Sequence, residues 1–472
     1  MSRTDVIVVG AGAAGAVLAA RLSEDSDRSV LLEAGPIPSE PSRFPADLLD
    51  ARFVPGAQPG HPAVRGRYLG GSTTVNGGYF IRARREDFDR WAAAGNPAWA
   101  YERILPFPRA LETDLDYGPH DVHGADGPVL VRRGEVKHPA AAAFAAAAQE
   151  LGFPREPDKN AQSTPGFGPV PSNAVDGLRL NTGVSYLRAA LNRPNLTVVG
   201  NSRVLRVVIS SGRGTGVLVD HGGRHTILDA GEVVPCAGSF VTPHLLHLLH
   251  LLHLSGIGPR TDLERLGLPV LKDAPAVGAR FSDYPQVLLE WAPRKDLGEP
   301  TDSWLGGCLH LSSCDGAYEG DLEVLQSLTP MAAPVGGTVT VPGAPLAFLV
   351  SAQTPRRTGM LRLRSADPAR PPRIDYGYLR APEDRRRLRE GVRTAVALTD
   401  TRTFGEVSRA LLGPDPGTLA NDRDLDAWIA GHLGTAHHTC GTAPMGPADD
   451  PATIVDRYGR VHGIAGLRVA DT

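Results

Sequence analysis

The N-terminal part of the chain alternates short hydrophobic runs with glycine. Val6–Val9 is a run of β-branched residues typical of a buried strand, and it stops at a glycine-rich turn. A helical stretch follows and reaches Glu24, and Ser29–Glu33 predicts a second strand that ends in an acid. This order of strand, turn, helix and strand begins a βαβ unit and favours an α/β fold.

Later segments extend this first unit. Residues 36–66 are rich in Pro and Gly with little periodicity, which predicts an irregular crossing. Residues 139–150 are Ala-rich and helical, while Leu196–Val208 and Val217–Val234 have strand composition broken by glycine turns. We expect these strands to form hairpins added to the first unit.

The pattern changes from about residue 283. Val287–Trp291 and Leu346–Ala352 are strand candidates, and a charged helix is predicted around Pro382–Asp400. We assign residues 283–435 to a second domain. The length of 472 residues agrees with roughly two to four domain-sized units.

Composition narrows the classes of function. A net charge of −3 creates no strong field for nucleic acid, so small molecules are the expected partners. The four cysteines lack paired CxxC spacing and are too few to staple a chain of this length, which favours a reducing cytoplasm. No run of about 20 uninterrupted apolar residues predicts a membrane-spanning helix.

The first glycine turn has the spacing GxGxxG. Gly10 allows the strand to turn, Gly12 lets the backbone approach a pyrophosphate, and Gly15 lets helix and strand pack closely. The alternative is a turn that serves only tight packing. The flanking strands and helix favour a dinucleotide site.

The residues that follow the turn suit the same ligand. Backbone N–H groups near Ala13 and Ala14, at the positive end of the helix dipole, attract phosphate without a cationic side chain. Glu33 lies 18 residues past Gly15 and can accept hydrogen bonds from ribose hydroxyls. These residues do not separate FAD from NAD, because both carry adenosine diphosphate.

A set of ordered motifs separates the two cofactors. They are Gly70–Arg82, Asp87–Trp91, Ser255–Pro259 and His438–Thr442 with Met445-Gly446. Together they resemble the glucose-methanol-choline oxidoreductase family along nearly the whole chain. The resemblance implies FAD as cofactor and oxidation of an alcohol by hydride transfer to flavin N5. It also implies a discontinuous, Rossmann-like FAD domain, residues 1–282 and 436–472, with an inserted substrate domain on an antiparallel sheet.

The resemblance also assigns cofactor contacts. Gly70, Gly71, Ser72 and Asn76 are expected at the flavin ring and pyrophosphate, Val204 at the adenine through its backbone, and Asp471 near the pyrophosphate and ribityl chain. Some family members attach the flavin through a histidine just before the asparagine. Val75 occupies that position here, which predicts a non-covalent flavin.

His438 is the candidate catalytic base. Alcohol oxidation needs a group that takes the hydroxyl proton, and imidazole exchanges protons near neutral pH. By similarity to the family's histidine, His438 would lie over the flavin. The alternative is a hydrogen-bonded core histidine. His437 is interpreted as a structural neighbour, with a role as substitute base as the less favoured alternative.

The Gly77–Phe80 segment with His437–Gly446 also resembles an actinobacterial branch associated with mycofactocin, a peptide-derived redox cofactor. This resemblance implies reduced mycofactocin as a substrate. The electron acceptor is left open between oxygen and a quinone or other carrier. The expected location is cytoplasmic, or peripheral at the inner face of the membrane.

Three features depart from the family pattern. The family's second His or Asn would follow Thr472, so we expect either a fragment or a truncated chain with little activity. The Leu-Leu-His segment carries His244, His247, His250 and His253, which fan across a helix and do not converge on one tetrahedral ion, although adjacent pairs could chelate weakly. Arg82, Arg84 and Arg85 are interpreted as a solvated face rather than an anion site. A flavin-containing lyase of the same fold is the remaining alternative.

Overall fold

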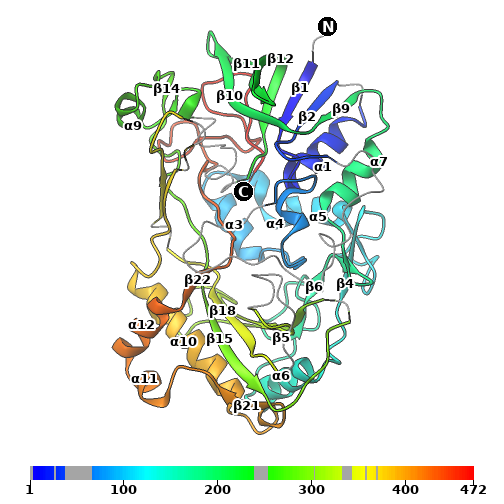
Figure 1. Ribbon diagram of the computed structural model, residues 1–472, viewed down its shortest axis with the longest axis vertical. Helices are drawn as coiled ribbons and strands as arrows, with labels where there is room; N and C mark the ends of the chain where they lie inside the picture. Colours follow the sequence, from blue (N-terminus) through cyan, green and yellow to red (C-terminus); the bar gives the residue numbers. More distant parts are fainter. Residues whose placement is uncertain are drawn as a thin grey trace.

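The computed structural model describes residues 4–25, 28–37, 66–238, 253–301, 303–331, 343–356, 359–367, 370 and 372–471. Its strands gather mainly into two large sheets, at the top and bottom of Figure 1, and the C-terminus lies between them. Residues 38–65 of the expected crossing, and His244, His247 and His250, lie outside the described residues.

The upper sheet has six strands. In spatial order they are β10 (Ser202–Ser210), β11 (Arg213–His221), β12 (Arg224–Pro235), β1 (Thr4–Val9), β2 (Ser29–Leu32) and β9 (Leu196–Val199). The strands from β12 to β9 are parallel, and β10, β11 and β12 are joined as antiparallel hairpins. The expected hairpins therefore extend the edge of a parallel core.

The strand β1 is hydrophobic throughout because both faces of its sheet are covered. Val6 and Val8 pack with α1 (Ala13–Leu22) on one face. Ile7 and Val9 pack on the other face with residues from the C-terminal part of the chain, such as Leu467. A buried parallel strand requires such a run, since alternate residues point to opposite sides.

The lower sheet is antiparallel. Its strands, in spatial order, are β21 (Ser408–Leu411), β15 (Pro285–Pro293), β18 (Leu346–Ala352), β17 (Leu322–Ser327), β16 (Leu305–Leu311) and β5 (Phe167–Pro169), with β22 (Leu433–Thr435) also paired to β15. Because β5 precedes residue 283, this sheet draws on both sides of the expected boundary. The division at residues 282 and 435 stays a prediction.

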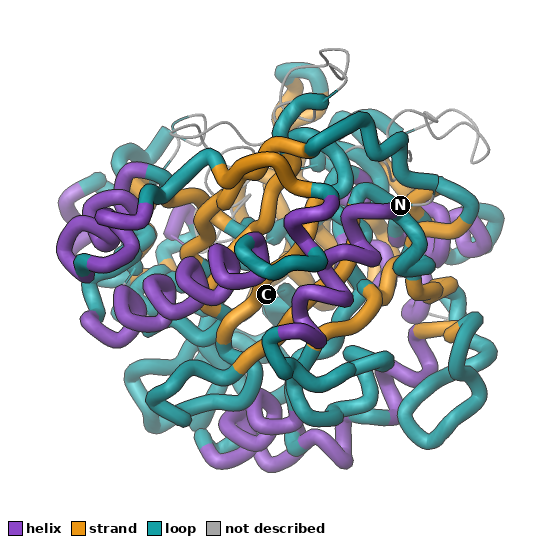
Figure 2. Tube along the Cα trace, turned by 90° about the horizontal axis from the view of Figure 1, so that it is seen from below, coloured by secondary structure: helices purple, strands orange, loops and turns teal. Residues whose placement is uncertain are grey.

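The two faces of the lower sheet differ. The outer face is covered by α6 (Pro139–Glu150), α10 (Pro382–Thr399) and α12 (Asp422–Gly431), which share one hydrophobic cluster with it. Figure 2, seen from below, shows helices lying across strands on this side. The inner face carries a smaller apolar cluster that includes Trp304 and Leu325. Trp304 Nε1 donates a hydrogen bond to Gly77 O at 3.2 Å, so the inner face contacts the glycine cluster of residues 66–78, here called the second glycine segment.

The remaining elements connect or flank the sheets. They are η1 (Gly71–Thr74), α3 (Arg85–Ala93), η2 (Pro97–Trp99), α4 (Tyr101–Ile104), α5 (Pro106–Leu111), β3 (Glu112–Asp114), β4 (Val129–Arg133), β6 (Pro171–Ser172), β7 (Ala174–Val175), β8 (Leu178–Arg179), η3 (Gly183–Leu187), α7 (Arg188–Ala190), β13 (Ile257–Gly258), α9 (Arg260–Arg265), β14 (Lys272–Asp273), β19 (Met360–Arg362), β20 (Arg373–Asp375), η5 (Phe404–Glu406) and α11 (Pro416–Ala420). Among the described residues, no helix has the length and apolar character needed to cross a bilayer.

The arginine run after the second glycine segment corrects one expectation. Arg82 and Arg84 do not form a solvated face, because Arg82 pairs with Glu112 at 2.6 Å and Arg84 with Glu156 at 3.0 Å, and both carboxylates are buried. Only Arg85 keeps a largely exposed side chain, paired with Glu102. Buried acids elsewhere in the fold, which sequence spacing does not show, draw the first two arginines inward.

Candidate active site

The first glycine turn connects β1 to α1 in the conformation that its spacing predicted. Gly10 has φ +96°, and a Cβ there would lie 2.9 Å from Cys236 O. A Cβ on Gly15 would lie 1.9 Å from Gly10 O, so helix and strand pack with no room for a side chain. The helix starts at Ala13, and the N–H groups of its first turn, including that of Ala14, have no acceptor within the helix.

The second glycine segment lies directly against the first. Gly70 and Gly71 have φ +90° and +52°, and Gly70 N–H donates to Ala11 O at 2.8 Å. A Cβ on Gly71 would lie 2.6 Å from Gly12 Cα. Two segments about 60 residues apart in the sequence thus meet backbone to backbone.

Glu33 follows the end of β2 beside the same turn. Its Oε2 accepts a hydrogen bond from Ala11 N–H at 2.9 Å, and its Oε1 accepts one from Gly35 N–H at 2.7 Å. Burial raises the pKa of Glu33, although both hydrogen bonds oppose the shift. The carboxylate is therefore tied to the turn, where it can face a ribose.

The other expected cofactor residues lie at different places around this turn. Ser72 Oγ accepts from Gly66 N–H at 3.4 Å, and Asn76 is exposed, with its Oδ1 accepting from Gly78 N–H at 3.4 Å. Val204 is buried in β10. Asp471 accepts a hydrogen bond from Gly238 N–H, so the C-terminal segment lies beside the end of β12.

The predicted residues fit a dinucleotide. Gly12 has no atom closer than 4.0 Å in the direction of its missing Cβ, which leaves its backbone accessible at the helix start. The turn, the helix N-terminus and a carboxylate at the end of the second strand are the parts that a dinucleotide site requires. Sequence spacing predicted these parts because all of them are local to one βαβ unit.

His438 lies in the loop that follows β22, and its main chain is held by Asp283. The backbone N–H of His438 donates to Asp283 Oδ1 at 2.8 Å. Tyr378 donates its hydroxyl to Asp283 Oδ2 at 2.6 Å, and the hydroxyl of Thr435 donates to the same oxygen. One carboxylate thus fixes the strand end and the histidine loop together.

The two histidines of this loop have different surroundings. His438 is exposed, and its ring stands edge-on to Tyr284, with centroids 5.2 Å apart and an interplanar angle of 88°. His437 has φ +64°, and its N–H donates to Thr435 Oγ1 at 2.9 Å. The geometry leaves the His438 imidazole accessible and gives His437 a place in the turn.

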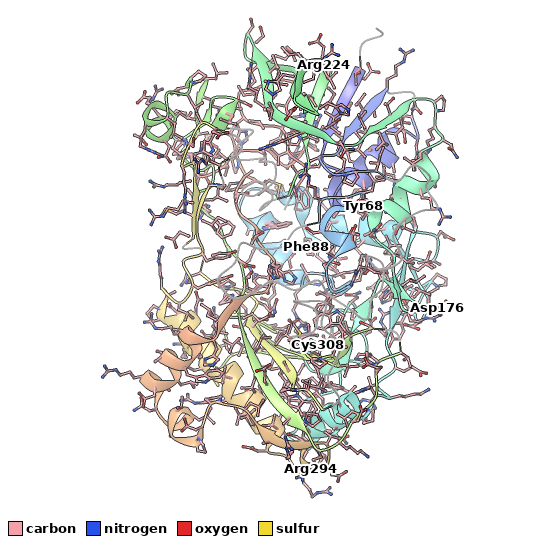
Figure 3. The ribbon with its side chains drawn as sticks, in the orientation of Figure 1. Tyr68, Phe88, Asp176, Arg224, Arg294 and Cys308 are labelled. Carbon is pink, nitrogen blue, oxygen red and sulfur yellow. The ribbon has the colours of Figure 1, made fainter. Side chains whose placement is uncertain are left out.

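Sequence reasoning missed the polar groups on the inner face of the lower sheet. Four side-chain atoms come together above β16 and β17. They belong to Tyr79, Cys308, His310 and Glu323, here called the polar cluster. Figure 3 shows Cys308 in the lower half of the molecule, below Tyr68 and Phe88. The signal in the sequence is the alternation Cys308-x-His310, which places both side chains on one face of a strand.

Burial and charge act in opposite directions on the acid of this cluster. Burial alone would raise the pKa of Glu323, but the hydrogen bond from His310 and the charges of His310 and His438 outweigh it and hold the pKa below its usual range.

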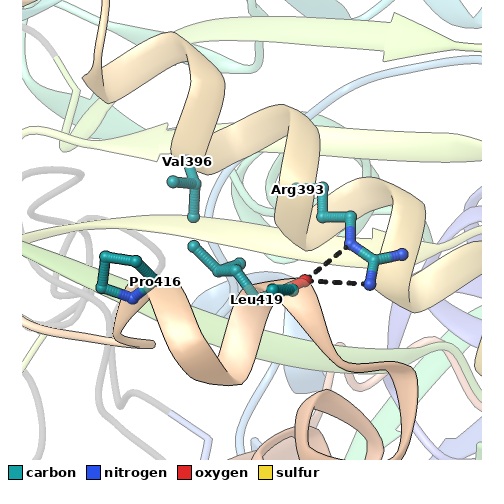
Figure 4. A pocket seen from close by; sticks show the side chains of 5 residues that line it. Arg393, Val396, Pro416 and Leu419 are labelled. Carbon is teal, nitrogen blue, oxygen red and sulfur yellow. Dashed lines mark hydrogen bonds between the residues drawn. The ribbon is translucent and has the colours of Figure 1, made fainter.

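A separate pocket of about 360 Å³ lies between α10 and α11 (Figure 4). Arg393 donates from Nε and Nη2 to Leu419 O, at 3.2 and 2.9 Å, and closes one side of it. None of the predicted cofactor or catalytic residues lines this pocket.

Comparison with known proteins gives the family. Two sequence profiles, both described as GMC oxidoreductase, match residues 4–286 and 355–472. An oxygen-dependent choline dehydrogenase from Sinorhizobium medicae is 33% identical over 513 aligned positions, which cover 100% of this chain and 91% of the relative. A GMC-type oxidoreductase from Rhodococcus erythropolis is 36% identical, over 99% of this chain and 92% of the relative.

Solved structures agree with the sequence profiles. The crystal structure of pyridoxine 4-oxidase from Mesorbium loti superposes with a TM-score of 0.87 at 27% identity, covering 99% of this chain and 94% of that one. A formate oxidase superposes with a TM-score of 0.86, covering 100% of this chain and 93% of that one, and at 23% identity it shows the shared fold alone. From its sequence, its two sheets and these matches, the chain belongs to the GMC oxidoreductase family, as the ordered motifs indicated.

Proposed function

We propose that this protein oxidises the CH–OH group of an alcohol with a non-covalently bound FAD, using His438 as the base. The observation that carries the proposal is the anchored loop of His438. The backbone N–H of His438 donates a hydrogen bond to Asp283 Oδ1 at 2.8 Å, and the imidazole of His438 remains exposed. A base must be positioned and accessible at once, and this loop provides both conditions.

FAD is the cofactor of this family, and the described residues suit it. Gly10, Gly12 and Gly15 with the start of α1 would hold the pyrophosphate, and Glu33 would accept hydrogen bonds from the ribose. The neighbouring segment would contribute Gly70, Gly71, Ser72 and Asn76, with Val204 and Asp471 at the adenine and pyrophosphate sides. Val75 offers no nucleophile for a covalent bond to the flavin.

The chemistry divides between cofactor and protein. FAD, when bound, accepts the hydride that leaves the alcohol carbon. His438 takes the hydroxyl proton as the carbonyl forms, because imidazole exchanges protons near neutral pH. The Asp283 anchor and the Tyr284 ring restrict where the imidazole lies during this transfer.

The substrate proposal begins with the alcohols named for the relatives. Choline and a pyridoxine-type alcohol are the first candidates, since an oxygen-dependent choline dehydrogenase and a pyridoxine 4-oxidase align with nearly the whole chain. Reduced mycofactocin is the third, from the Gly77–Phe80 and His437–Gly446 segments. Oxygen and a quinone or other carrier are the two classes of acceptor to compare.

Steady-state assays test these assignments. Purified holoenzyme is given each alcohol with either oxygen or a quinone analogue, and carbonyl product and peroxide are measured separately. We expect product with at least one alcohol, a decrease in kcat of about 10²-fold or more in His438→Ala, and a much smaller decrease in His437→Ala. Equal losses in the two variants would contradict the assignment of the base.

A further inference from the structure

The polar cluster has a defined place in the fold. Cys308 and His310 are alternate residues of β16, and Glu323 is the register partner of His310 in β17. All three are buried, and they point to the inner face of the sheet, opposite the apolar cluster that packs on α10. Tyr79, which lies 229 residues from Cys308 in the chain, reaches the group from the second glycine segment.

The four terminal atoms form a compact tetrahedron. Cys308 Sγ, His310 Nε2 and Glu323 Oε2 lie 3.6, 3.8 and 3.1 Å from one another, taken as S–N, S–O and N–O. Tyr79 Oη lies 3.4 Å from the sulfur, 3.5 Å from the nitrogen and 3.0 Å from the oxygen. Tetrahedral bonds of ordinary Zn–S, Zn–N and Zn–O length require ligand separations of about 3.3 to 3.6 Å. The three separations among Cys308, His310 and Tyr79 lie within this range, and a shift of the Glu323 carboxylate by a few tenths of an ångström would bring in the other three.

Hydrogen bonds to one acceptor, Glu323 Oε2, can also bring these atoms together. A thiol, a phenol and one ring nitrogen bring at most three protons, and the carboxylate of Glu323 brings none when it is ionised. At most three of the six close contacts can therefore be hydrogen bonds. Convergence on Glu323 Oε2 explains the other three separations, and a single ion at the centre of the four atoms would hold the same arrangement.

The surroundings also suit a divalent ion. A thiolate and a carboxylate balance two positive charges, and in the part of the chain that the structure describes no lysine or arginine pairs with Glu323. The other ring nitrogen of His310, Nδ1, faces Glu156 Oε2 at 3.6 Å, and Glu156 is itself held by Lys159 at 2.6 Å. At 3.6 Å this contact is too long for a hydrogen bond, so Glu156 supplies a nearby negative charge rather than a partner that fixes the ring.

A second compact group shows the contrast. Glu112, Asp114 and His123 also lie within reach of one another. Arg82 and Arg133 already pair with its two acids, at 2.6 Å in each case. Its charges are therefore compensated by protein, and it does not need an ion.

We propose that Cys308, His310 and Glu323 bind one divalent ion of the zinc class, with the hydroxyl of Tyr79 at the fourth corner. Mixed sulfur, nitrogen and oxygen ligands in a tetrahedral arrangement select zinc over magnesium or calcium. The site joins β16 and β17 to the second glycine segment. Its four residues belong neither to the dinucleotide turn nor to the Asp283 anchor of the His438 loop.

The test measures bound metal on the full-length holoenzyme. Purified protein is incubated with one equivalent of Zn²⁺, passed through a desalting column and analysed for zinc by mass spectrometry. We expect one zinc per chain in the wild type, and loss of the ion in Cys308→Ser and in the nearly isosteric Glu323→Gln. Cys314→Ser is the matched control, because Cys314 is an exposed thiol outside the polar cluster, and it should retain the ion.

Cobalt gives a second readout that does not depend on activity. With Co²⁺ in place of Zn²⁺, the wild type should show ligand-field bands at wavelengths longer than those that flavin absorbs, and Cys308→Ser should lose them. Circular dichroism and flavin content identify a variant that fails to fold, in which case Glu323→Gln decides. Wild-type protein that retains no zinc, or zinc retained equally by Glu323→Gln, would overturn the proposal.

Discussion

The carboxylate of Asp283 accepts a hydrogen bond from the backbone N–H of His438 at 2.8 Å, across 155 residues of sequence. The same carboxylate accepts hydrogen bonds from the hydroxyls of Tyr378 and Thr435. In each of these hydrogen bonds Asp283 is the acceptor. If His438 is the base, as proposed, Asp283 would act on catalysis through it as a positioning residue.

Asp283→Asn should slow turnover while leaving flavin bound. The amide replaces an acceptor with a donor that faces the Tyr378 or Thr435 hydroxyl, and the loop shifts to relieve the mismatch. A displaced base lowers kcat by on the order of 10²-fold, with a smaller effect on KM. Tyr378→Phe, which removes one donor and leaves the carboxylate, should have a milder effect. An unchanged kcat in Asp283→Asn would show that the anchor does not position the base.

Gly15→Ala should destabilise the cofactor domain and lower FAD content. The added Cβ would lie 1.9 Å from Gly10 O, which forces α1 away from β1. Overpacking of this kind costs about 1 to 3 kcal/mol in the free energy of unfolding. Thermal unfolding and the ratio of flavin to protein absorbance measure both effects.

Gly134→Ala is the matched control for that substitution. A Cβ at Gly134 meets nothing within 4 Å, so its unfolding temperature and flavin content should equal those of the wild type. If both alanine variants lose FAD to the same degree, close packing at the turn is not the cause.

His123 should stabilise the fold in a pH-dependent way. Burial would lower its pKa, but hydrogen bonds with Asp114, Asp158 and Glu112 outweigh burial and raise the pKa to about 10. The folded pKa lies above the unfolded value of about 6.5, so the stabilisation is fully present below that pH. It declines as the pH rises and is lost as the pH passes the folded value.

Urea unfolding of the wild type and His123→Gln across this pH range tests the sign. We expect the variant to be less stable by on the order of 3 kcal/mol near pH 6, because buried carboxylates lose their partner. The difference should shrink toward pH 10. His225→Gln, on the exposed part of β12, should match the wild type at every pH. A difference that grows with pH would contradict a protonated His123.

Local features explain how much of the fold the sequence predicted. The strand, turn and helix from Val6 to Leu22 depend on neighbours within one unit, and the expected strands at Val287–Trp291 and Leu346–Ala352 lie inside β15 and β18. The predicted helix around Pro382–Asp400 is α10. The ends of predicted and observed elements differ by a residue or two. Helix α1, for example, ends at Leu22 rather than at Glu24.

Contacts between distant segments explain what the sequence did not predict. The partnership of Asp283 with His438 depends on β22 pairing with β15, and a single aspartate before a strand gives no signal of it. The polar cluster needs the register of β16 and β17 and the reach of Tyr79 from the second glycine segment. Arg82 and Arg84 were expected in solvent, but both pair with buried acids. Tertiary packing brings these acids to the arginines, and sequence spacing does not show it.

The most direct test of the proposed function is the visible spectrum of the holoenzyme without oxygen, recorded before and after addition of choline, a pyridoxine-type alcohol and reduced mycofactocin. We expect flavin bands that bleach with at least one of these compounds in the wild type and in His437→Ala. In His438→Ala the same bands should persist with the flavin still bound. Bleaching at an unchanged rate in His438→Ala would contradict the assignment of His438 as the base.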